Sequence, residues 1–285
     1  MGKEWRVLRV KVLVTGANGL LGRRCVEEFH KNGVEVIATD FATNNIIVDV
    51  IKIDCNIFDI EDPYEYFGKP DAVLHMAWKD VHTMNSDAHF EHLGNHATFL
   101  RKLVESGLKQ LSIMGTMSEI GLYEGSLKED TPANPMNNYG IAKVALRSYA
   151  KILCENNNVV FQWLRAYITV FDFGNNDSLF GKLRMAEAQG QKEFPLNSGK
   201  NLFDFLDAGK SAEQVVAAVM QQEINGVIEI CFGEPMRLSE RVEQFIKDNN
   251  FKIRLNYGAF PERPFDSKAI WGDNTKIQKI LENRK

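Results

Sequence analysis

The chain has few cysteines, and no two of them form a Cys-x-x-Cys pair. The four are Cys25, Cys55, Cys154 and Cys231, and their scatter argues against a disulfide framework and against a zinc site. We therefore expect buried thiols in a reducing compartment, and a cytoplasmic protein. Long apolar runs are also missing. None approaches the roughly 18 residues of a membrane span, so no membrane partner is expected.

Neither sign of charge dominates. The 34 Lys and Arg residues stand against 38 Asp and Glu residues, a formal net charge of −4. A nucleic-acid partner would favour a basic face, so this mild acidity argues against one. Apolar residues make up 44% of the sequence and charged residues 25%, which excludes a disordered or fibrous chain. Residues 1–11 interleave charged and apolar side chains, so they lack the apolar core of a secretory signal.

Strand-like and helix-like segments alternate along the sequence. Apolar, β-branched-rich runs predict strands at Val7–Thr15, Val34–Thr39, Ile46–Ile53, Asp71–His75, Gln110–Met114, Val159–Leu164 and Val227–Cys231. Helical spacing predicts helices at Leu20–Lys31, Ala88–Ser106, Asn138–Glu155, Leu179–Gln189, Ser211–Gln222 and Ser239–Asn249. The alternation predicts an α/β fold: a Rossmann-type, doubly wound parallel sheet covered by helices on both faces, with a smaller C-terminal lobe.

A glycine-rich turn, Thr15-Gly16-Ala17-Asn18-Gly19-Leu20-Leu21-Gly22, joins the first predicted strand to the first predicted helix. Its three glycines allow a tight turn, close approach of the backbone to a pyrophosphate, and close packing of helix on strand. The helix N-terminus adds free N–H groups and a partial positive charge. No lysine follows Gly22, which excludes a Walker-type phosphate loop. The turn predicts dinucleotide binding.

An acidic residue, Asp40, ends the second predicted strand. Its carboxylate can accept hydrogen bonds from ribose hydroxyls and would repel a 2′-phosphate, which favours NAD(H). NADP(H) remains possible, because Arg23 and Arg24 lie nearby and could offset the repulsion. We favour the other interpretation of these arginines, a solvated outer face of the helix.

A tyrosine and a lysine lie four residues apart at the start of a predicted helix. This spacing places Tyr139 and Lys143 on one face, where Lys143 is expected to lower the pKa of the phenol and to hold a ribose. The motif alone is common by chance. It gains weight from the predicted strand Leu111–Thr116, because the carboxyl ends of parallel strands are where such sheets bind ligands. Thr116, Tyr139 and Lys143 are the predicted catalytic residues.

With these motifs, the sequence resembles the extended short-chain dehydrogenase/reductase family, often called the NAD-dependent epimerase/dehydratases of nucleotide sugars. The resemblance covers nearly the whole chain. Thr15–Gly22 fits the family's TGxxGxxG fingerprint, His75–Trp78 its HLAA segment, and Thr116–Gly121 its (S/T)xxVYG segment. It implies a cofactor site made of Gly16, Asn18, Gly19, Leu20, Leu21, Gly22, Asp40, Asp54, Met76, Ala77, Trp78, Asn95, Tyr139 and Lys143.

The resemblance also implies a substrate site, formed by Thr116, Met117, Ser118, Tyr139 and Arg165. Dehydratases of the family carry Thr-Asp-Glu where this sequence has Thr116-Met117-Ser118, so dehydration is disfavoured. The implied NAD(P)-binding domain spans 1–166 and about 203–231, and the substrate-binding lobe spans about 167–202 and 232–285. Candidate partners of a substrate diphosphate, each more often a plain surface charge, are Lys182, Arg184, Arg237 and Arg263.

Within the family, the sequence looks most like the nucleotide-sugar 4-keto-6-deoxyhexose reductases, the group that includes dTDP-6-deoxy-L-talose 4-dehydrogenases. The expected activity is NAD(P)H-dependent reduction of the 4-keto group of a nucleotide-linked, dTDP-type sugar in deoxysugar biosynthesis. One alternative is a nucleotide-sugar 4-epimerase with tightly bound NAD, and another is a non-catalytic dinucleotide-sensing protein. By the same resemblance, a homodimer is possible.

Five of the six histidines lie between His75 and His96. His89, His92 and His96 share one face of a predicted helix, but a nearby carboxylate, Glu91, points elsewhere on it. No metal site is expected, and we favour a partly solvated helix, with His75 buried at a strand end. Trp78 is equally suited to stacking on a ligand and to plain packing.

Overall fold

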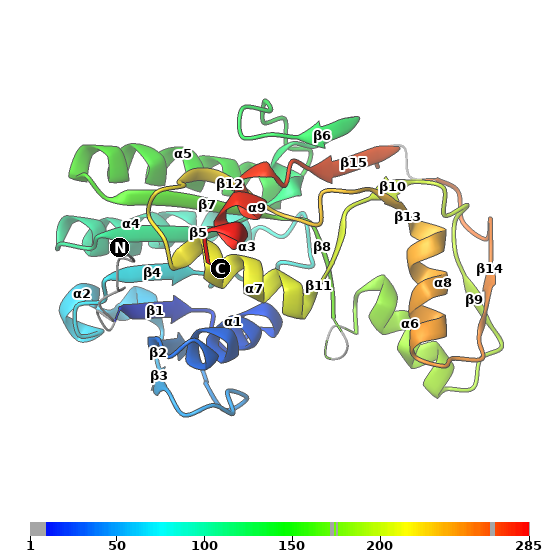
Figure 1. Ribbon diagram of the computed structural model, residues 1–285, viewed down its shortest axis with the longest axis horizontal. Coiled ribbons are helices and arrows are strands. Elements are labelled where there is room, and N and C mark those ends of the chain that lie inside the picture. Colours follow the sequence, from blue (N-terminus) through cyan, green and yellow to red (C-terminus); the bar gives the residue numbers. More distant parts are fainter. Residues whose placement is uncertain (1–9, 172–173, 175, 263–265, 285) are drawn as a thin grey trace.

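The alternation of side chains along β1 (Lys11–Thr15) explains the layered architecture. Val12 and Val14 are fully buried on one face and Leu13 on the other, and the two faces belong to separate apolar cores. A strand that is apolar on both faces needs cover on both. The computed structural model, which describes residues 10–171, 174, 176–262 and 266–284, provides this cover with two layers of helices (Figure 1).

The central sheet is parallel throughout and has the order β12-β7-β5-β4-β1-β2-β3. The chain builds outward from β1 to one edge and then crosses back to β4 on the other side. This reversal leaves a crevice at the carboxyl ends of β1 and β4, where doubly wound sheets bind ligands. The strands beside β1 are β2 (Glu35–Asp40), β3 (Ile51–Asp54), β4 (Ala72–His75), β5 (Gln110–Thr116), β7 (Val160–Ala166) and β12 (Gly226–Ile230).

The two helix layers pack on opposite faces of this sheet. One contains α1 (Leu20–Lys31), α7 (Ala208–Val219) and α9 (Thr275–Glu282), which contact one another and share a core with the strands. The other contains α2 (Pro63–Tyr66), α4 (Leu93–Glu105), α5 (Asn138–Asn157) and the short 3-10 helix η1 (Ile57–Asp59). The predicted fold class is confirmed.

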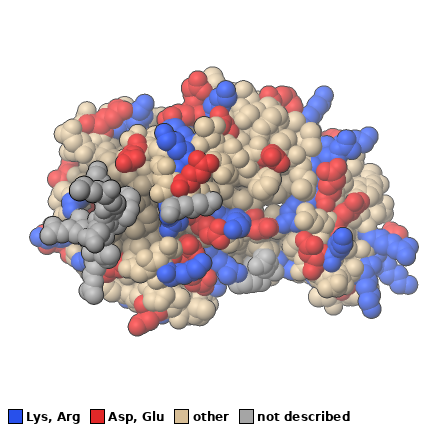
Figure 2. Space-filling view, in the orientation of Figure 1, with Lys and Arg blue, Asp and Glu red and all other residues tan. Residues whose placement is uncertain are grey.

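A second lobe lies beside the sheet, at the opposite end of the molecule from α2 (Figure 1). Its core joins α6 (Leu179–Ala188) and α8 (Leu238–Asp248) to the paired strands β9 (Glu193–Pro195) and β14 (Arg254–Asn256). Lys and Arg gather at the far end of this lobe, whereas both signs mix over the rest of the visible face (Figure 2). The connecting strands are β8 (Ile168–Val170), β11 (Phe205–Asp207), and the small sheet of β13 (Met236–Arg237), β10 (Leu202–Phe203), β15 (Ala269–Gly272) and β6 (Gly125–Leu127).

Three features differ from the sequence-based expectation. The predicted strand Ile46–Ile53 begins only at Ile51, because the chain turns before it and Lys52 Nζ binds the Ile46 carbonyl at 2.7 Å. The predicted helix Ala88–Ser106 is interrupted at His92, which gives α3 (Ala88–Glu91) and α4. The last helix, α9, packs on α7 and β12 instead of in the second lobe. Beyond that, the division into two domains stays a prediction.

Across the described ranges of the chain, no helix is both long and apolar enough to span a membrane.

Candidate active site

The glycine-rich turn after β1 is tightly packed against the end of β4. Gly16 has a φ of +68°, and a Cβ atom there would lie 2.6 Å from the backbone nitrogen of Ala77. A Cβ at Gly22 would lie 2.2 Å from the Gly16 carbonyl oxygen. Both positions therefore require glycine. Gly19 forms the N-cap of α1 without a side-chain hydrogen bond, so the N–H groups of the first turn remain available to a phosphate.

Asp40 follows this turn at the carboxyl end of β2. Its carboxylate accepts hydrogen bonds from the backbone N–H of Asn18 at 3.0 Å and of Phe41 at 2.8 Å. Asn18 thus orients Asp40 and does not line the cleft itself. Asp54 does not line it either: its carboxylate binds the backbone and hydroxyl of Thr43, and the next residue, Cys55, faces the cleft instead.

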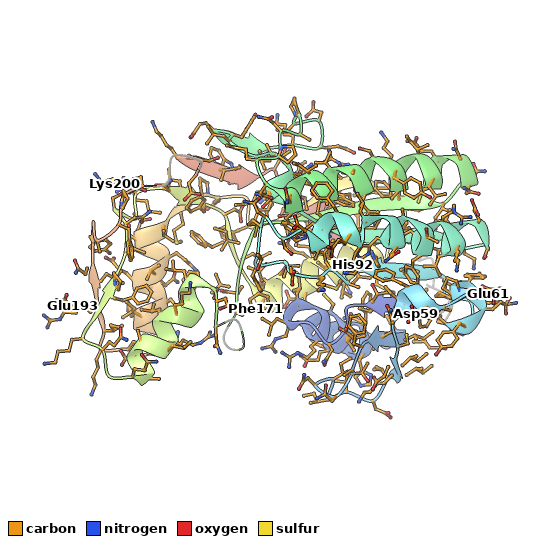
Figure 3. The ribbon with its side chains drawn as sticks, turned by 180° about the vertical axis from the view of Figure 1, so that it is seen from behind. Asp59, Glu61, His92, Phe171, Glu193 and Lys200 are labelled. Carbon is orange, nitrogen blue, oxygen red and sulfur yellow. The ribbon has the colours of Figure 1, made fainter. Side chains whose placement is uncertain are left out.

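A cleft of about 770 Å³ connects these features, within the size range of small-molecule sites. His92 lines it from the junction of α3 and α4, and Phe171 lies toward the second lobe (Figure 3). The predicted cofactor residues that line the cleft are Gly16, Gly19, Leu20, Leu21, Gly22, Asp40, Met76, Ala77, Trp78, Asn95, Tyr139 and Lys143. Lining residues not predicted include Asn56, Phe58, Lys79, His82, His92, Thr169 and Phe171. Thr169 and Phe171 come shortly after β7. Because ligands bind beyond the carboxyl ends of parallel strands, their position in the sequence could have indicated that they line the cleft.

The start of α5 places the tyrosine and the lysine. The Asn137 side chain caps the helix by accepting from Gly140 N–H at 2.8 Å, and the Tyr139 N–H donates to the Met84 carbonyl at 2.9 Å. A Cβ at Gly140 would lie 2.4 Å from the Ser118 carbonyl oxygen. Glycine here lets α5 approach the short 3-10 helix η2 (Met117–Glu119), which directly follows Thr116.

Thr116 is held at the end of β5 by a reciprocal cap. Its hydroxyl accepts from the Ser118 N–H at 3.2 Å, and the Glu119 carboxylate accepts from the Thr116 N–H at 2.8 Å. The hydroxyl proton remains available for donation. The Thr116 side chain also forms a hydrogen bond that favours the charged form of the Tyr139 phenol. The structure thus brings the three predicted catalytic residues together.

The protonation of the pair differs from the sequence-based expectation. Burial, assisted by the negative charge of Glu119, raises the pKa of Tyr139, whereas Lys143 was expected to lower it. Lys143 Nζ lies 5.8 Å from the centroid of the tyrosine ring and donates to the Met114 carbonyl at 2.9 Å, so its charge is not aimed at the phenol. Lys143 is 2% exposed, and burial lowers its pKa to about 7 although Glu119 opposes the shift.

Three of the five clustered histidines, His75, His89 and His96, are buried instead of lying on a solvated helix face, whereas His82 is exposed and His92 half-buried. His75 Nδ1 lies 2.8 Å from the Thr15 hydroxyl, and His75 Nε2 lies 2.9 Å from His96 Nδ1. Burial lowers the pKa of His75 to about 3 and of His96 to about 2, so both rings are neutral at physiological pH. The chain of bonds ends at the buried Thr15 and fixes the ends of β1 and β4. No group of three potential metal ligands gathers among the described residues.

Arg165 does not reach the cleft, in contrast to the predicted substrate contact. Its side chain is fully buried and pairs with Glu229 at 2.5 Å, and it lies 3.7 Å from Glu119. A buried guanidinium needs carboxylate partners, and buried residues of this chain, Glu229 and Glu119, provide them in place of a substrate. Met117 and Ser118 follow Thr116 on η2. None of these three predicted substrate residues lines the cleft, and Thr116 reaches it only through its hydrogen bond to Tyr139.

The candidate diphosphate partners are dispersed. Arg184 donates to the Phe171 carbonyl at 2.7 Å, next to the cleft. Lys182 is exposed on the same helix, and Arg237 is an exposed residue 3.9 Å from Glu240. Arg263 lies outside the described residues. Their part in substrate binding stays a prediction.

Comparisons with known proteins agree with this geometry. The chain is 35% identical over 272 residues to dTDP-6-deoxy-L-talose 4-dehydrogenase (NAD(+)) of Aggregatibacter actinomycetemcomitans, covering 92% of this chain and 99% of the relative. It is 28% identical over 304 residues to UDP-glucose 4-epimerase of Lactobacillus helveticus, covering 95% and 91%. The UDP-N-acetylglucosamine 4-epimerase structure from Methanobrevibacter ruminantium M1 has the same fold, with a TM-score of 0.83 and 19% identity over 95% of this chain and 91% of that one.

The family match covers the sheet and the whole cleft. The sequence profile of the NAD dependent epimerase/dehydratase family fits residues 12–231, from β1 through β12. The glycine cradle, the uncapped start of α1 and the carboxylate of Asp40 suit NAD, the cofactor named for this family. The chain belongs to the NAD dependent epimerase/dehydratase family.

Proposed function

We propose that the protein is an NADH-dependent reductase of the 4-keto group of a nucleotide-linked 4-keto-6-deoxyhexose, with dTDP as the favoured nucleotide. The observation that carries this proposal is that Tyr139 and Lys143 line the cleft that begins with the glycine turn, while Thr116 is hydrogen-bonded to Tyr139. The 35% identity to a relative named as a dTDP-6-deoxy-L-talose 4-dehydrogenase supports the substrate class.

The glycine turn, Asp40 and Lys143 would hold the dinucleotide, with Lys143 at the nicotinamide ribose. When bound, NADH supplies the hydride that adds to the carbonyl carbon of the sugar. The residues of the chain then have two tasks: to hold the carbonyl oxygen in place and to give it a proton.

Tyr139 is suited to give that proton. Because the pKa of Tyr139 is raised, the phenol carries its proton at neutral pH and donates it to the oxygen as the C–H bond forms. When the sugar is bound, the hydroxyl of Thr116, whose lone pair accepts the Ser118 N–H, would turn its one proton from the Tyr139 phenol to the same oxygen. Negative charge developing on the oxygen is thus met by donors that are already in place.

Dehydration has no support from the residues around Thr116. Met117 and Ser118 carry no carboxylate, and the nearest one, Glu119, is fully buried. It accepts hydrogen bonds from Thr116, Arg147 and Trp163 instead of facing the cleft. Elimination of water needs an acid and a base beside the sugar, and the described residues next to Thr116 supply neither.

A 4-epimerase is the second candidate. It is favoured by the 28% identity to a UDP-glucose 4-epimerase, and it would use the same three residues with a retained NAD. Purified protein that carries NAD⁺ and interconverts sugar epimers without added reductant would support it. A non-catalytic dinucleotide sensor has no need of an acid–base tyrosine, so the presence of Tyr139 beside Thr116 counts against that alternative.

The test is oxidation of NADH, and in parallel of NADPH, with 4-keto-6-deoxyhexoses linked to dTDP, GDP, CDP and UDP. We expect turnover with NADH and preference for one nucleotide, dTDP. The matched variant is Tyr139→Phe, which should lose about 100- to 10,000-fold in kcat while it still binds NADH. Absence of turnover with every sugar, combined with epimer interconversion, would replace the reductase proposal by the epimerase.

A further inference from the structure

Trp78 lies against the charged end of Lys143, a contact that the proposed mechanism does not use. The Lys143 Nζ atom is 3.9 Å from the centroid of the indole ring. Tryptophan is the strongest aromatic partner of a cation, and the attraction grows when the pair is shielded from water. Lys143 is 2% exposed, so this pair is shielded. We propose that Trp78 and His89 are positioning residues, in which the indole holds the Lys143 ammonium group and His89 fixes the indole.

His89 fixes Trp78 through a defined tautomer. The Trp78 Nε1–H donates to His89 Nδ1 at 3.0 Å, which makes Nδ1 an acceptor. The neutral ring therefore carries its proton on Nε2, which donates to the Thr83 carbonyl at 2.9 Å. Both ring nitrogens are satisfied, and His89 is 1% exposed. The imidazole is therefore locked between the indole and the backbone of the loop that precedes α3.

The remaining contacts of Trp78 leave it little freedom. The indole stacks on His96 with ring centroids 4.5 Å apart and planes 10° apart. It also meets Tyr139 edge-on, with centroids 6.1 Å apart. Trp78 thus touches the lysine and the tyrosine of the triad from one rigid position.

The charges around Lys143 explain why an aromatic partner matters. Glu119, from η2, is the opposite charge that favours the ammonium form. The charge of Lys143 opposes protonation of two nearby rings, His75 on β4 and His96 on α4. Tyr139 lies on α5, the same helix as Lys143. Because burial lowers the pKa of Lys143 to about 7, ammonium and amine are both accessible near neutral pH, and an attraction to the cation alone shifts the balance.

The test follows the titration of Lys143 directly. The full-length protein is labelled with ¹³C-lysine, the Lys143 signal is assigned by its loss in Lys143→Met, and its midpoint is measured by NMR. In Trp78→Leu the midpoint should fall by about 0.5 to 1.5 pH units, and by less in Trp78→Phe, which keeps a weaker aromatic face. Trp271→Leu, in β15, is the matched control and should leave the midpoint unchanged.

Two variants test His89 separately. His89→Phe removes the acceptor of the indole N–H and should lower the midpoint in the same direction by a smaller amount. His89→Asn restores a carbonyl oxygen near the place of Nδ1 and should return the midpoint toward wild type. A wild-type midpoint in both Trp78→Leu and Trp78→Phe would overturn the proposal. If Trp78→Leu does not fold, Trp78→Phe decides alone.

This inference rests on the proposed function for its consequence, but not for its test. In the reductase assay, Trp78→Phe should lower kcat more than it weakens NADH binding, and the pH profile of kcat should move with the Lys143 midpoint. If the wild-type protein turns over no keto sugar, the proposed function fails while the NMR midpoints still decide the role of Trp78. If wild-type protein reduces the keto sugar but the Lys143 midpoint does not move in the Trp78 variants, the proposed function stands and the positioning role of Trp78 is refuted.

Discussion

The Glu119 carboxylate accepts a hydrogen bond from the indole Nε1 of Trp163 at 2.7 Å, beside the strand end that carries Thr116. The same carboxylate accepts from the Thr116 N–H at 2.8 Å and pairs with Arg147 at 2.8 Å. Its negative charge adds to the upward shift of the Tyr139 pKa, and it partly offsets the downward shift that burial causes in the pKa of Lys143. Glu119 therefore holds Thr116 in place and also influences the protonation of Tyr139 and Lys143.

The pH dependence of the reduction should follow the lysine. Tyr139 stays protonated above neutral pH because its pKa is raised, so the phenol does not limit the rate there. Lys143 loses its charge as the pH rises through about 7, and with it the cation that we propose holds the nicotinamide ribose. The kcat for NADH oxidation should therefore fall on the alkaline side of pH 7. A rate that climbs from neutral pH to pH 9 would contradict this assignment.

Glu119→Gln should move that alkaline limb to lower pH. The amide keeps the shape of the side chain but removes the negative charge that favours the Lys143 ammonium, so the pKa of Lys143 falls further. The measurement is the pH profile of kcat for the variant beside wild type, with thermal melting to confirm folding. An unshifted profile in a folded variant would show that Glu119 acts on position alone.

The close approach of α5 to η2 can be tested at one atom. In Gly140→Ala the new methyl group would lie 2.4 Å from the Ser118 carbonyl, so the first turn of α5 must move away from Thr116. We expect a loss in kcat of about 10- to 100-fold with NADH affinity little changed. Gly209→Ala in α7, where no atom lies within 4 Å of the new carbon, is the control and should keep wild-type kcat. Equal kcat in the two variants would refute the positional argument.

The buried histidine pair should make the protein sensitive to acid. In the folded protein the pKa is about 3 for His75 and about 2 for His96, against 6.5 without burial, so the unfolded chain binds more protons below pH 6.5. The free energy of unfolding should fall with decreasing pH, by up to about 1.4 kcal/mol per pH unit for each ring. Urea unfolding at several pH values measures this slope.

Two variants separate that effect from general acid denaturation. His96→Phe should reduce the slope, because one of the two rings no longer titrates. His30→Gln, at the exposed end of α1, should leave it unchanged. Identical slopes in all three proteins would assign the acid sensitivity to other groups.

Local patterns predicted the parts of the site that neighbouring residues determine. The helix Leu20–Lys31 has the predicted bounds, because Asn32 and Gly33 supply its stop signal within the same segment. The spacing of Tyr139 and Lys143 likewise lies within a single helical turn. Both inferences needed only residues close in the sequence.

Long-range pairing accounts for what the patterns missed. Arg165 pairs with Glu229, 64 residues later, and nothing near Arg165 in the sequence indicates that partner. A helical period showed that His89 and His96 share a face, but not that Trp78 from the end of β4 would cover it. The direction of the Tyr139 pKa shift also depends on burial and on Glu119, which the motif does not contain.

The most direct measurement uses NADH deuterated at the transferable position of the nicotinamide, with a dTDP-linked 4-keto-6-deoxyhexose as the acceptor. We expect one deuterium at C4 of the sugar product for each NADH oxidised, and almost none of this product with Tyr139→Phe. If no NADH is oxidised and no labelled alcohol forms, while the protein interconverts the C4 epimers of a nucleotide sugar without added reductant, the reductase proposal is contradicted and an epimerase is identified.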